Sequence, residues 1–286
     1  MMKMPSFRIA VTLPLLLQAA LAFQPLVFSG TRVSGSNSRL LATVVRNPEA
    51  EDAAKAAYAL PPIPPNGKRL FLIRHGEVVN PGGSRKVFYG DMNVPLTLLG
   101  QKEACVAADY LSRSKLTAVY TSPLSRAFYG AQQVGARQQQ QETLLTPIRL
   151  QGLSELKRGA WRGKTKDEIG EEQLARFDAC DLSVTPARGE SFPALHQRVT
   201  AALYDTILPS VPTGESAAIV SHLQVTRCLV AEALGVPLES MTQEIAIQTA
   251  SITCIDYVNH VVPQQIVRFQ SFKPEAGLPG SQDGAN

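Results

Sequence analysis

Short apolar runs alternate with longer amphipathic segments between about residues 68 and 272. The runs have the length of buried strands and are bounded by glycine, proline or polar residues. They cover residues 70–73, 118–121, 147–150, 217–221, 252–257 and 265–269. Because helical segments separate most of these runs, the pattern predicts an α/β fold in which strands and helices alternate.

The amphipathic segments carry signals for where their helices begin and end. Thr97 can cap the helix that follows it, and Ser122-Pro123 supplies a cap followed by a proline at the first helical position. A long helix with one apolar face opens after Gly189-Glu190-Ser191. The helix predicted over residues 226–234 stops at Gly235.

Composition and charge exclude some classes of partner. Of the 286 residues, 44% are hydrophobic and 18% are charged, which is typical of a globular protein. Residues 1–67 hold six basic and three acidic side chains, so the net charge of +4 leaves +1 for the remainder, and we expect no nucleic-acid partner. The cysteines Cys105, Cys180, Cys228 and Cys254 form no C-x-x-C pair, so we expect reduced thiols and neither a disulfide frame nor a zinc site.

The start of the chain has the three parts of a secretory signal. Residues 1–22 combine a basic start, an apolar stretch too short and broken to span a bilayer, and a small-residue end. Residues 23–48 are rich in serine, threonine and arginine and hold no acid. With the junction Ala22-Phe23-Gln24-Pro25, this leader resembles the two-part leaders of algae whose plastids have extra envelope membranes. We expect a plastid location without membrane association of the mature chain; plain secretion is the alternative.

Composition also sets the remaining boundaries of the chain. Residues 49–67 end in a proline-rich stretch, which is typical of an extended linker. One folded domain is predicted over residues 68–272, because the strand and helix signals lie there. Residues 273–286 contain glycine and proline and few apolar side chains, so we expect a disordered tail.

Polar residues with chemical potential follow the ends of the central apolar runs. The first run leads into Arg74-His75-Gly76-Glu77, with Asn80 shortly after it, and His222 directly follows the fourth run. Arg126 lies in the first turn of a predicted helix, where backbone N–H groups already favour an anion. Because the carboxyl ends of parallel strands meet at one edge of a sheet, we expect Arg74, His75, Asn80, Arg126 and His222 to converge there.

This set of side chains suits the transfer of a phosphoryl group. Each of two guanidiniums can donate a pair of hydrogen bonds to the oxygens of a phosphoryl group. One imidazole can attack the phosphorus atom, and a second can hydrogen-bond the phosphoryl oxygens. Departure of an alkoxide also needs a general acid, for which Glu155 is the candidate, because Leu153 and Leu156 would shield its carboxyl group from water. The other histidines, His196 in a helix and His260 in a turn, are expected to be solvated or bonded locally.

The chain resembles the histidine phosphatase superfamily, with its phosphoglycerate-mutase-like fold, over residues 68–272. The motifs that carry the resemblance are Leu72-Ile73-Arg74-His75-Gly76-Glu77 with Asn80, Tyr89-Gly90, Pro95-Leu96-Thr97, Thr121-Ser122-Pro123-Leu124-Ser125-Arg126-Ala127, Leu153-Ser154-Glu155 with Gly159, Trp161 and Gly163, Gly189-Glu190-Ser191, and Val220-Ser221-His222. Several independent motifs in the family's order make coincidence a poor explanation. The resemblance implies a three-layer α/β/α sandwich with a mostly parallel central sheet.

The resemblance also implies a role for each site residue. His75 is the nucleophile that forms a phosphohistidine, and Glu155 protonates the leaving oxygen and then activates water. The phosphate pocket is formed by Arg74, Asn80, Arg126 and His222. No metal or cofactor is implied. The chain departs from many members at Leu223, a larger pocket wall where they have glycine, and at Val78, which removes one phosphate contact.

The activity implied by the resemblance is hydrolysis of a small phosphomonoester, with a sugar or sugar-acid phosphate favoured. Family mutases carry a long insertion after the acid, whereas 34 residues separate Glu155 from Glu190 here, and a short cap leaves the pocket open to water. A phosphoglycerate-type mutase and an inactive binding member are the alternatives. Basic residues on predicted loops, which indicate an acidic substrate unless they are ordinary solvated side chains, are Arg85, Lys86, Lys157, Arg158, Arg162 and Lys164.

Overall fold

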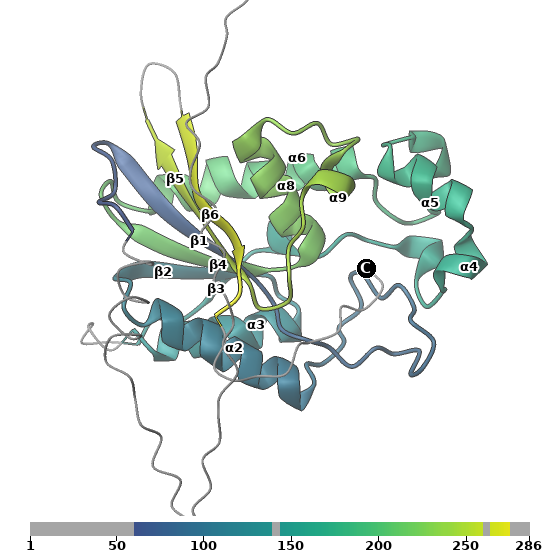
Figure 1. Cartoon of the computed structure of the whole chain (residues 1–286), viewed down its shortest axis with the longest axis horizontal. Helices are drawn as coiled ribbons and strands as arrows, with labels where there is room; N and C mark the ends of the chain where they lie inside the picture. The colour runs from purple at the N-terminus through teal and green to yellow at the C-terminus, as the bar shows by residue number, and fades with distance from the viewer. Residues whose placement is uncertain (1–59, 139–143, 260–263, 275–286) are drawn as a thin grey trace, which may run out of the picture. The chain divides into compact units, whose positions relative to one another are not determined.

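Six strands form one sheet at the centre of the computed structural model, which describes residues 60–138, 144–259 and 264–274 (Figure 1). The strands are β1 (Gly67–Arg74), β2 (Leu116–Thr121), β3 (Ile148–Arg149), β4 (Ser216–Ser221), β5 (Ile252–Val258) and β6 (Gln264–Phe272). Their order across the sheet is β3-β2-β4-β1-β5-β6. The predicted leader, the linker up to residue 59 and the tail from residue 275 lie outside the described residues.

The sheet is parallel on one side and antiparallel on the other. Strands β3, β2, β4 and β1 run parallel, and β5 and β6 add two antiparallel strands. Arg74 lies opposite Ser221 and Thr121 lies opposite Val220, so β1, β2 and β4 end at the same edge. The prediction of a mostly parallel α/β sheet is therefore confirmed, and the residues that follow these strands are brought side by side.

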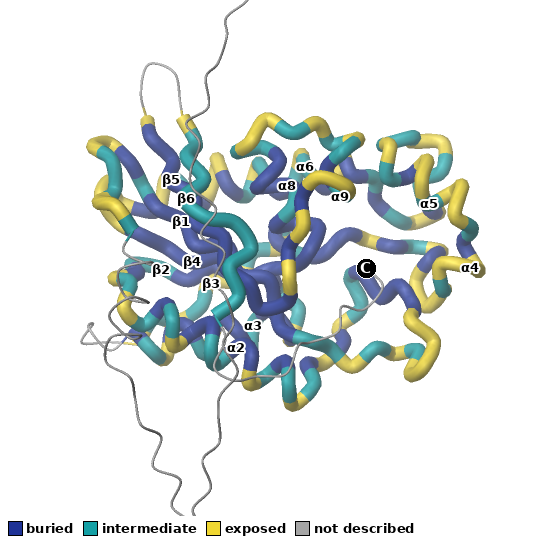
Figure 2. Tube along the Cα trace, viewed as in Figure 1, coloured by how far each residue is buried: buried dark blue, intermediate teal, exposed yellow. Residues whose placement is uncertain are grey.

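Helices cover both faces of the sheet, which completes the three expected layers (Figure 1). On one face lie α2 (Leu98–Leu111) and α3 (Ser125–Ala136), and on the other lie α6 (Phe192–Ala201), the π-helical η4 (Ala202–Ile207) and α8 (Leu223–Leu234). Successive side chains of β1 point to opposite faces, so Leu70 and Leu72 pack with α6 and α8, whereas Phe71 and Ile73 pack with α2 and α3. Figure 2 shows these central strands buried.

Sequence signals located some helix ends and misplaced one. Thr97 caps α2 by accepting a hydrogen bond from the Gly100 N–H at 2.9 Å, and Gly235 ends α8 with a φ of 67°. The helix start predicted at Ser122-Pro123 is wrong. The chain bends at Pro123 after leaving β2, Leu124 is extended with φ −68° and ψ 135°, and α3 begins only after that residue. The serine is therefore released from capping and is available for a different bond.

The segment between Glu155 and Glu190 consists of short helices and turns. Its elements are η2 (Gly159–Trp161), α4 (Lys166–Ile169), α5 (Glu171–Asp178) and η3 (Leu182–Val184). Figure 1 shows α4 and α5 on the side toward which β1 and β4 run. The Phe177 ring centroid lies 5.0 Å from that of Trp161 and 4.9 Å from that of Phe192, so aromatic contacts hold α5 beside the start of α6.

The remaining short elements are η1 (Gln151–Leu153), α7 (Leu208–Ser210) and α9 (Met241–Glu244). Five apolar residues predicted to face inward from the long helix are all buried: Phe192, Leu195, Val199, Leu203 and Ile207. The stretch includes the π-helical turn of η4, which no sequence signal predicted. Among the residues that the structure describes, no helix has the length and apolar character needed to cross a membrane.

Candidate active site

His75 follows β1 and is only 2% exposed. Its Nδ1 lies 2.7 Å from the Gly76 carbonyl oxygen, which can only accept, so the proton is on Nδ1 and Nε2 keeps a lone pair. The Arg126 Nε–H donates to that lone pair at 3.2 Å. A Cβ at Gly76 would lie 2.3 Å from the Gly100 carbonyl oxygen, so this turn requires glycine. The local backbone therefore presents a nucleophilic nitrogen to a guanidinium.

Arg126 lies in the first turn of α3 and is fully buried. Its Nη1 and Nη2 donate to the carbonyl oxygens of Met92 and Gly90, each at 2.6 Å, and its guanidinium carbon lies 5.3 Å from the centre of the Tyr89 ring. Burial lowers the pKa of Arg126. Within the described part of the chain no carboxylate bonds to it, so carbonyl groups orient the charge without cancelling it.

His222 follows β4, is fully buried, and immediately precedes α8, which begins earlier than predicted. Its Nε2 lies 2.7 Å from the Ser122 hydroxyl oxygen. That oxygen accepts the Leu124 N–H at 3.2 Å and can donate its own hydrogen to Nε2. In the tautomer in which Nε2 accepts, His222 Nδ1 carries the proton, and this atom has no bond to any described residue. The His75 and His222 ring centroids are 5.1 Å apart, so the two rings are in edge-to-face contact.

Burial and neighbouring positive charge keep both histidines neutral. Burial lowers the pKa of His75 well below its ordinary 6.5, and the charges of Arg126 and Arg74 lower it further. The pKa of His222 is lowered well below 6.5 by burial and then by Arg126 and His75. Arg74 is itself 1% exposed, and its Nη1 donates to the Ile247 carbonyl oxygen at 2.7 Å. At neutral pH the site therefore holds two neutral imidazoles and two cations.

Glu155 follows η1 by two positions, lies against the first turn of α8, and is 1% exposed. Its Oε1 accepts the Leu156 N–H at 2.8 Å, and its Oε2 accepts the Gln224 N–H, in the first turn of α8, at 3.4 Å. Free N–H groups at a helix start favour a carboxylate. The buried carboxyl group is thereby fixed in orientation, as a proton donor and acceptor requires.

Arg198 of α6 braces the segment that carries Glu155. Its Nη1 donates to the Gly152 carbonyl oxygen at 2.9 Å and its Nη2 to the Glu155 carbonyl oxygen at 3.2 Å. The same guanidinium bonds both carboxylate oxygens of Glu190, at 2.7 and 2.8 Å. Sequence reasoning placed Glu190 only at a helix start and missed Arg198. Its partners in this segment lie more than 40 positions away, so no local pattern marks it.

Five of the predicted site residues meet in one buried group. They are Arg74, His75, Arg126, Glu155 and His222. Direct contacts join His75 to Arg126 and His222, while Arg74 and Glu155 lie close enough to affect the pKa of their neighbours. Among the described residues, no group of three or more His, Cys, Asp or Glu side chains could hold a metal ion.

The two remaining predicted pocket residues are Asn80 and Leu223. Asn80 bonds its own loop, because its Oδ1 accepts the Gly82 N–H at 2.9 Å and its Nδ2 donates to the Val87 carbonyl oxygen at 3.2 Å. These bonds shape the loop after β1 and leave no bond to another site residue. Leu223 is 7% exposed at the first position of α8, directly after His222.

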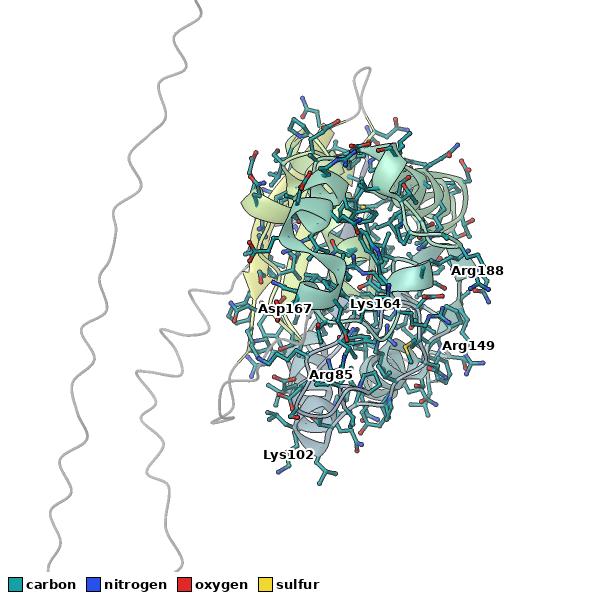
Figure 3. The ribbon with its side chains drawn as sticks, turned by 90° about the vertical axis from the view of Figure 1, so that its right-hand side faces the viewer. Arg85, Lys102, Arg149, Lys164, Asp167 and Arg188 are labelled. Atoms are coloured by element: carbon teal, nitrogen blue, oxygen red, sulfur yellow. The ribbon has the colours of Figure 1, made fainter. Side chains whose placement is uncertain are left out.

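The basic residues expected near the pocket mouth are of two kinds. Arg85 pairs with Glu168 at 2.5 Å, and Arg162 pairs with Asp91 at 2.6 Å. The face of the domain seen in Figure 3 carries Arg85, Lys164 and Asp167. Arg158 differs from these surface residues because it is only 3% exposed. Arg85 and Arg162 thus form ion pairs between loops, whereas the buried Arg158 forms none with a described residue.

Known proteins share the sequence pattern and the fold of this chain. Residues 70–268 match the model of the histidine phosphatase superfamily, branch 1. Phosphoserine phosphatase 1 of Hydrogenobacter thermophilus is 28% identical over 59% of this chain and 78% of its own. The 2,3-bisphosphoglycerate-dependent phosphoglycerate mutase of Brucella anthropi is 31% identical over 62% of this chain and 87% of its own. A solved mycobacterial glucosyl-3-phosphoglycerate phosphatase shares the fold, with a TM-score of 0.62 and 22% identity over 72% of this chain and 99% of its own.

Proposed function

The chain belongs to the histidine phosphatase superfamily, and we propose that it hydrolyses a small phosphomonoester through a phosphohistidine on His75. One observation carries the proposal: the His75 Nε2 lone pair faces the Arg126 guanidinium at 3.2 Å, and both residues are buried. A phosphoryl group that enters between them meets a nucleophile and a cation together. Binding of the anion and attack on phosphorus are thus coupled in one place.

In the first step, Nε2 of His75 attacks phosphorus, and the bond from phosphorus to the leaving oxygen breaks. Glu155 gives its proton to that oxygen, so that an alcohol leaves instead of an alkoxide. The phosphoryl oxygens are bound by Arg74, Arg126 and the Nδ1–H of His222. These donors are already oriented by the protein, so they stabilise developing negative charge without reorganisation.

In the second step, the Glu155 carboxylate takes a proton from a water molecule as the water oxygen attacks phosphorus. The bond from phosphorus to Nε2 breaks, and the electron pair returns to His75. Inorganic phosphate leaves, and Glu155 is protonated for the next cycle. The proposed steps use no metal ion and no cofactor.

Hydrolysis is proposed over a mutase reaction because the cap is short. Residues 156–189 hold only short helices and turns, among them α4 and α5. A mutase must keep water away from the phosphohistidine while the bound intermediate reorients, and a short cap is poorly suited to this. Phosphoglycerate-type mutase activity and an inactive binding member of the family are the competing functions. They differ in whether inorganic phosphate is released and in whether a bisphosphate primer is needed.

The test is release of inorganic phosphate by the purified protein from a chromogenic phosphomonoester and a panel of sugar and sugar-acid phosphates. We expect release without a primer, its loss in His75→Ala, and a turnover lower by about 10²–10⁴-fold in Glu155→Gln with phosphate binding retained. His196→Ala is the control, because the partly exposed His196 of α6 bonds Glu232 of α8 at 2.9 Å and no predicted site residue in the described part of the chain.

Each competing function has its own outcome in this assay. A primer-dependent product that keeps its phosphate would establish a mutase. Equally slow turnover of every substrate by wild type and His75→Ala would support an inactive binding member. Normal turnover in Glu155→Gln would assign the acid role to another group.

For the substrate we propose a sugar or sugar-acid phosphate. The names of two similar proteins specify phosphoserine and glucosyl-3-phosphoglycerate, and both compounds carry a carboxylate as well as a phosphate. The leader supports a plastid location for this reaction. Fusion of residues 1–60 to a fluorescent protein tests that location, and secretion of the fusion into the medium would contradict it.

A further inference from the structure

Arg158 carries a buried positive charge that no described residue meets with a hydrogen bond or an ion pair. The residue follows Glu155 by three positions, is 3% exposed, and its Nε is covered without a partner. Its guanidinium carbon lies 4.6 Å from the centre of the Phe88 ring and 5.9 Å from that of Phe177. Burying an unpaired N–H donor such as this Nε is costly, and the guanidinium has further donors on its two Nη atoms. Such a group favours an anionic ligand.

Neighbouring charges act on Arg158 through space rather than by contact. Glu155 and Asp178 raise its pKa and Arg227 lowers it, while burial, the largest effect, brings the pKa down to about 10. The side chain is therefore still positively charged at neutral pH. Neither carboxylate forms an ion pair with it in the described part of the chain, so its donors remain available.

Arg158 is held by the same short segment that orients the phosphate-binding arginine. A Cβ on Gly90 would lie 2.5 Å from the Arg158 Cγ, so the stem of this side chain packs directly against Gly90. The Gly90 carbonyl oxygen accepts the Arg126 Nη2 at 2.6 Å. The preceding ring, Tyr89, lies 5.3 Å from the Arg126 guanidinium, and Phe88 lies against Arg158. Consecutive residues thus support two separate guanidiniums.

We propose that Arg158 binds a carboxylate of the substrate, a few bonds away from the phosphate that His75 attacks. The inference rests on the proposed function, because it extends the same site. Arg158 thereby becomes a specificity-determining residue. It makes phosphomonoesters that carry a carboxylate bind more tightly than phosphomonoesters of the same length without one.

A carboxylate suits this place better than a second phosphate. Asp178 acts on Arg158 through its charge, and it repels a dianionic phosphate about twice as strongly as a singly charged carboxylate. The flat carboxylate can also accept two parallel N–H bonds from one edge of a guanidinium. Phe88 and Phe177 are compatible with this arrangement, because their rings lie beside the guanidinium and leave its N–H groups for a ligand.

Calorimetric titration of the full chain with non-hydrolysable phosphonates tests the proposal without depending on turnover. The ligands are 3-phosphonopropanoate, its counterpart without a carboxylate, propylphosphonate, the same pair one carbon longer, and ethane-1,2-bisphosphonate. We expect wild type to bind the better carboxylate ligand about 10- to 100-fold more tightly than its counterpart without a carboxylate. Arg158→Gln should lose this advantage and bind the ligands without a carboxylate within about twofold of wild type.

Two further variants separate ligand binding from packing. Arg158→Lys keeps the charge but not the paired donors, so we expect it to retain part of the advantage. Arg162→Gln is the matched control, because Arg162 lies in the same segment and pairs with Asp91 on the surface. It should keep the full advantage.

Several results would overturn the proposal. Equal binding by wild type of the ligands with and without a carboxylate is one, and a carboxylate advantage that survives in Arg158→Gln is another. An equal loss for all ligands in Arg158→Gln and Arg158→Lys would indicate a packing role. Tighter binding of the bisphosphonate than of either carboxylate ligand would assign the place to a second phosphate. Failure of the proposed function is a separate result, namely no phosphate release in the hydrolysis assay.

Discussion

At the scale of single residues, each site histidine has one hydrogen bond that bears on its chemical character. The Gly76 carbonyl oxygen fixes the proton of His75 on Nδ1 and leaves a lone pair on Nε2. When the Ser122 hydroxyl group donates to His222 Nε2, 2.7 Å away, the Nδ1–H of His222 is left as a donor. In that state the proposed function assigns opposite roles to two identical side chains.

Ser122 is predicted to be a positioning residue for His222. We expect Ser122→Ala to lower kcat/KM about tenfold, because His222 loses the donor that keeps its proton on Nδ1. Ser122→Thr, which keeps a hydroxyl group, should recover most of the activity. Steady-state kinetics with the chromogenic substrate measure both. Ser125→Ala, at the exposed start of α3, is the control. Full activity in Ser122→Ala would mean that another group orients His222.

At the scale of elements, the position of Glu155 depends on a helix that is distant in sequence. Ser191 caps α6 by accepting the Ala194 N–H at 3.3 Å, and the preceding Glu190 bonds Arg198 two turns further along. Arg198 then donates to the Glu155 carbonyl oxygen. The start of α6 thus supports a segment that has little regular structure of its own.

The Arg198 support is predicted to contribute to both stability and turnover. Arg198→Met leaves the Glu190 carboxylate, whose side chain is 9% exposed, without its cation. We expect the free energy of unfolding to fall by about 2–4 kcal/mol, measured by urea denaturation, and kcat to fall because Glu155 loses its backbone support. Asp181→Asn is the control, since its pair with Arg176 is exposed and should matter little. Unchanged stability and kcat in Arg198→Met would refute this role.

At the scale of the whole molecule, the active site concentrates positive charge inside the fold. Arg74 and Arg126 are buried beside two imidazoles, and their charge together with burial lowers the pKa of His75 well below its ordinary value. Unfolding returns both imidazoles to water, where they titrate near pH 6.5. The stability of the fold and the electrostatics of the site are therefore linked.

Stability is predicted to fall in mild acid. Below about pH 6.5 the unfolded chain binds protons at His75 and His222 while the folded chain does not, so the free energy of unfolding decreases as the pH drops. The slope approaches about 1.4 kcal/mol per pH unit for each histidine, and the loss is absent above about pH 7. Urea denaturation between about pH 7.5 and pH 5 measures it. A His75→Asn/His222→Asn variant should lack this part of the slope, and an equal slope in that variant would contradict the assignment.

The sequence by itself determined the elements and the residue types of the site, because hydrophobic periodicity and capping are local signals. β1, β4, the Thr97 cap and the buried face of α6 were predictable in this way. Only the tertiary structure decided which polar groups meet. Arg126 reaches His75 across 51 positions and Ser122 reaches His222 across 100, whereas Asn80 is taken by its own loop. Such pairings depend on the parallel register of the strands and on competition among polar groups for partners. A local sequence pattern predicts neither of these.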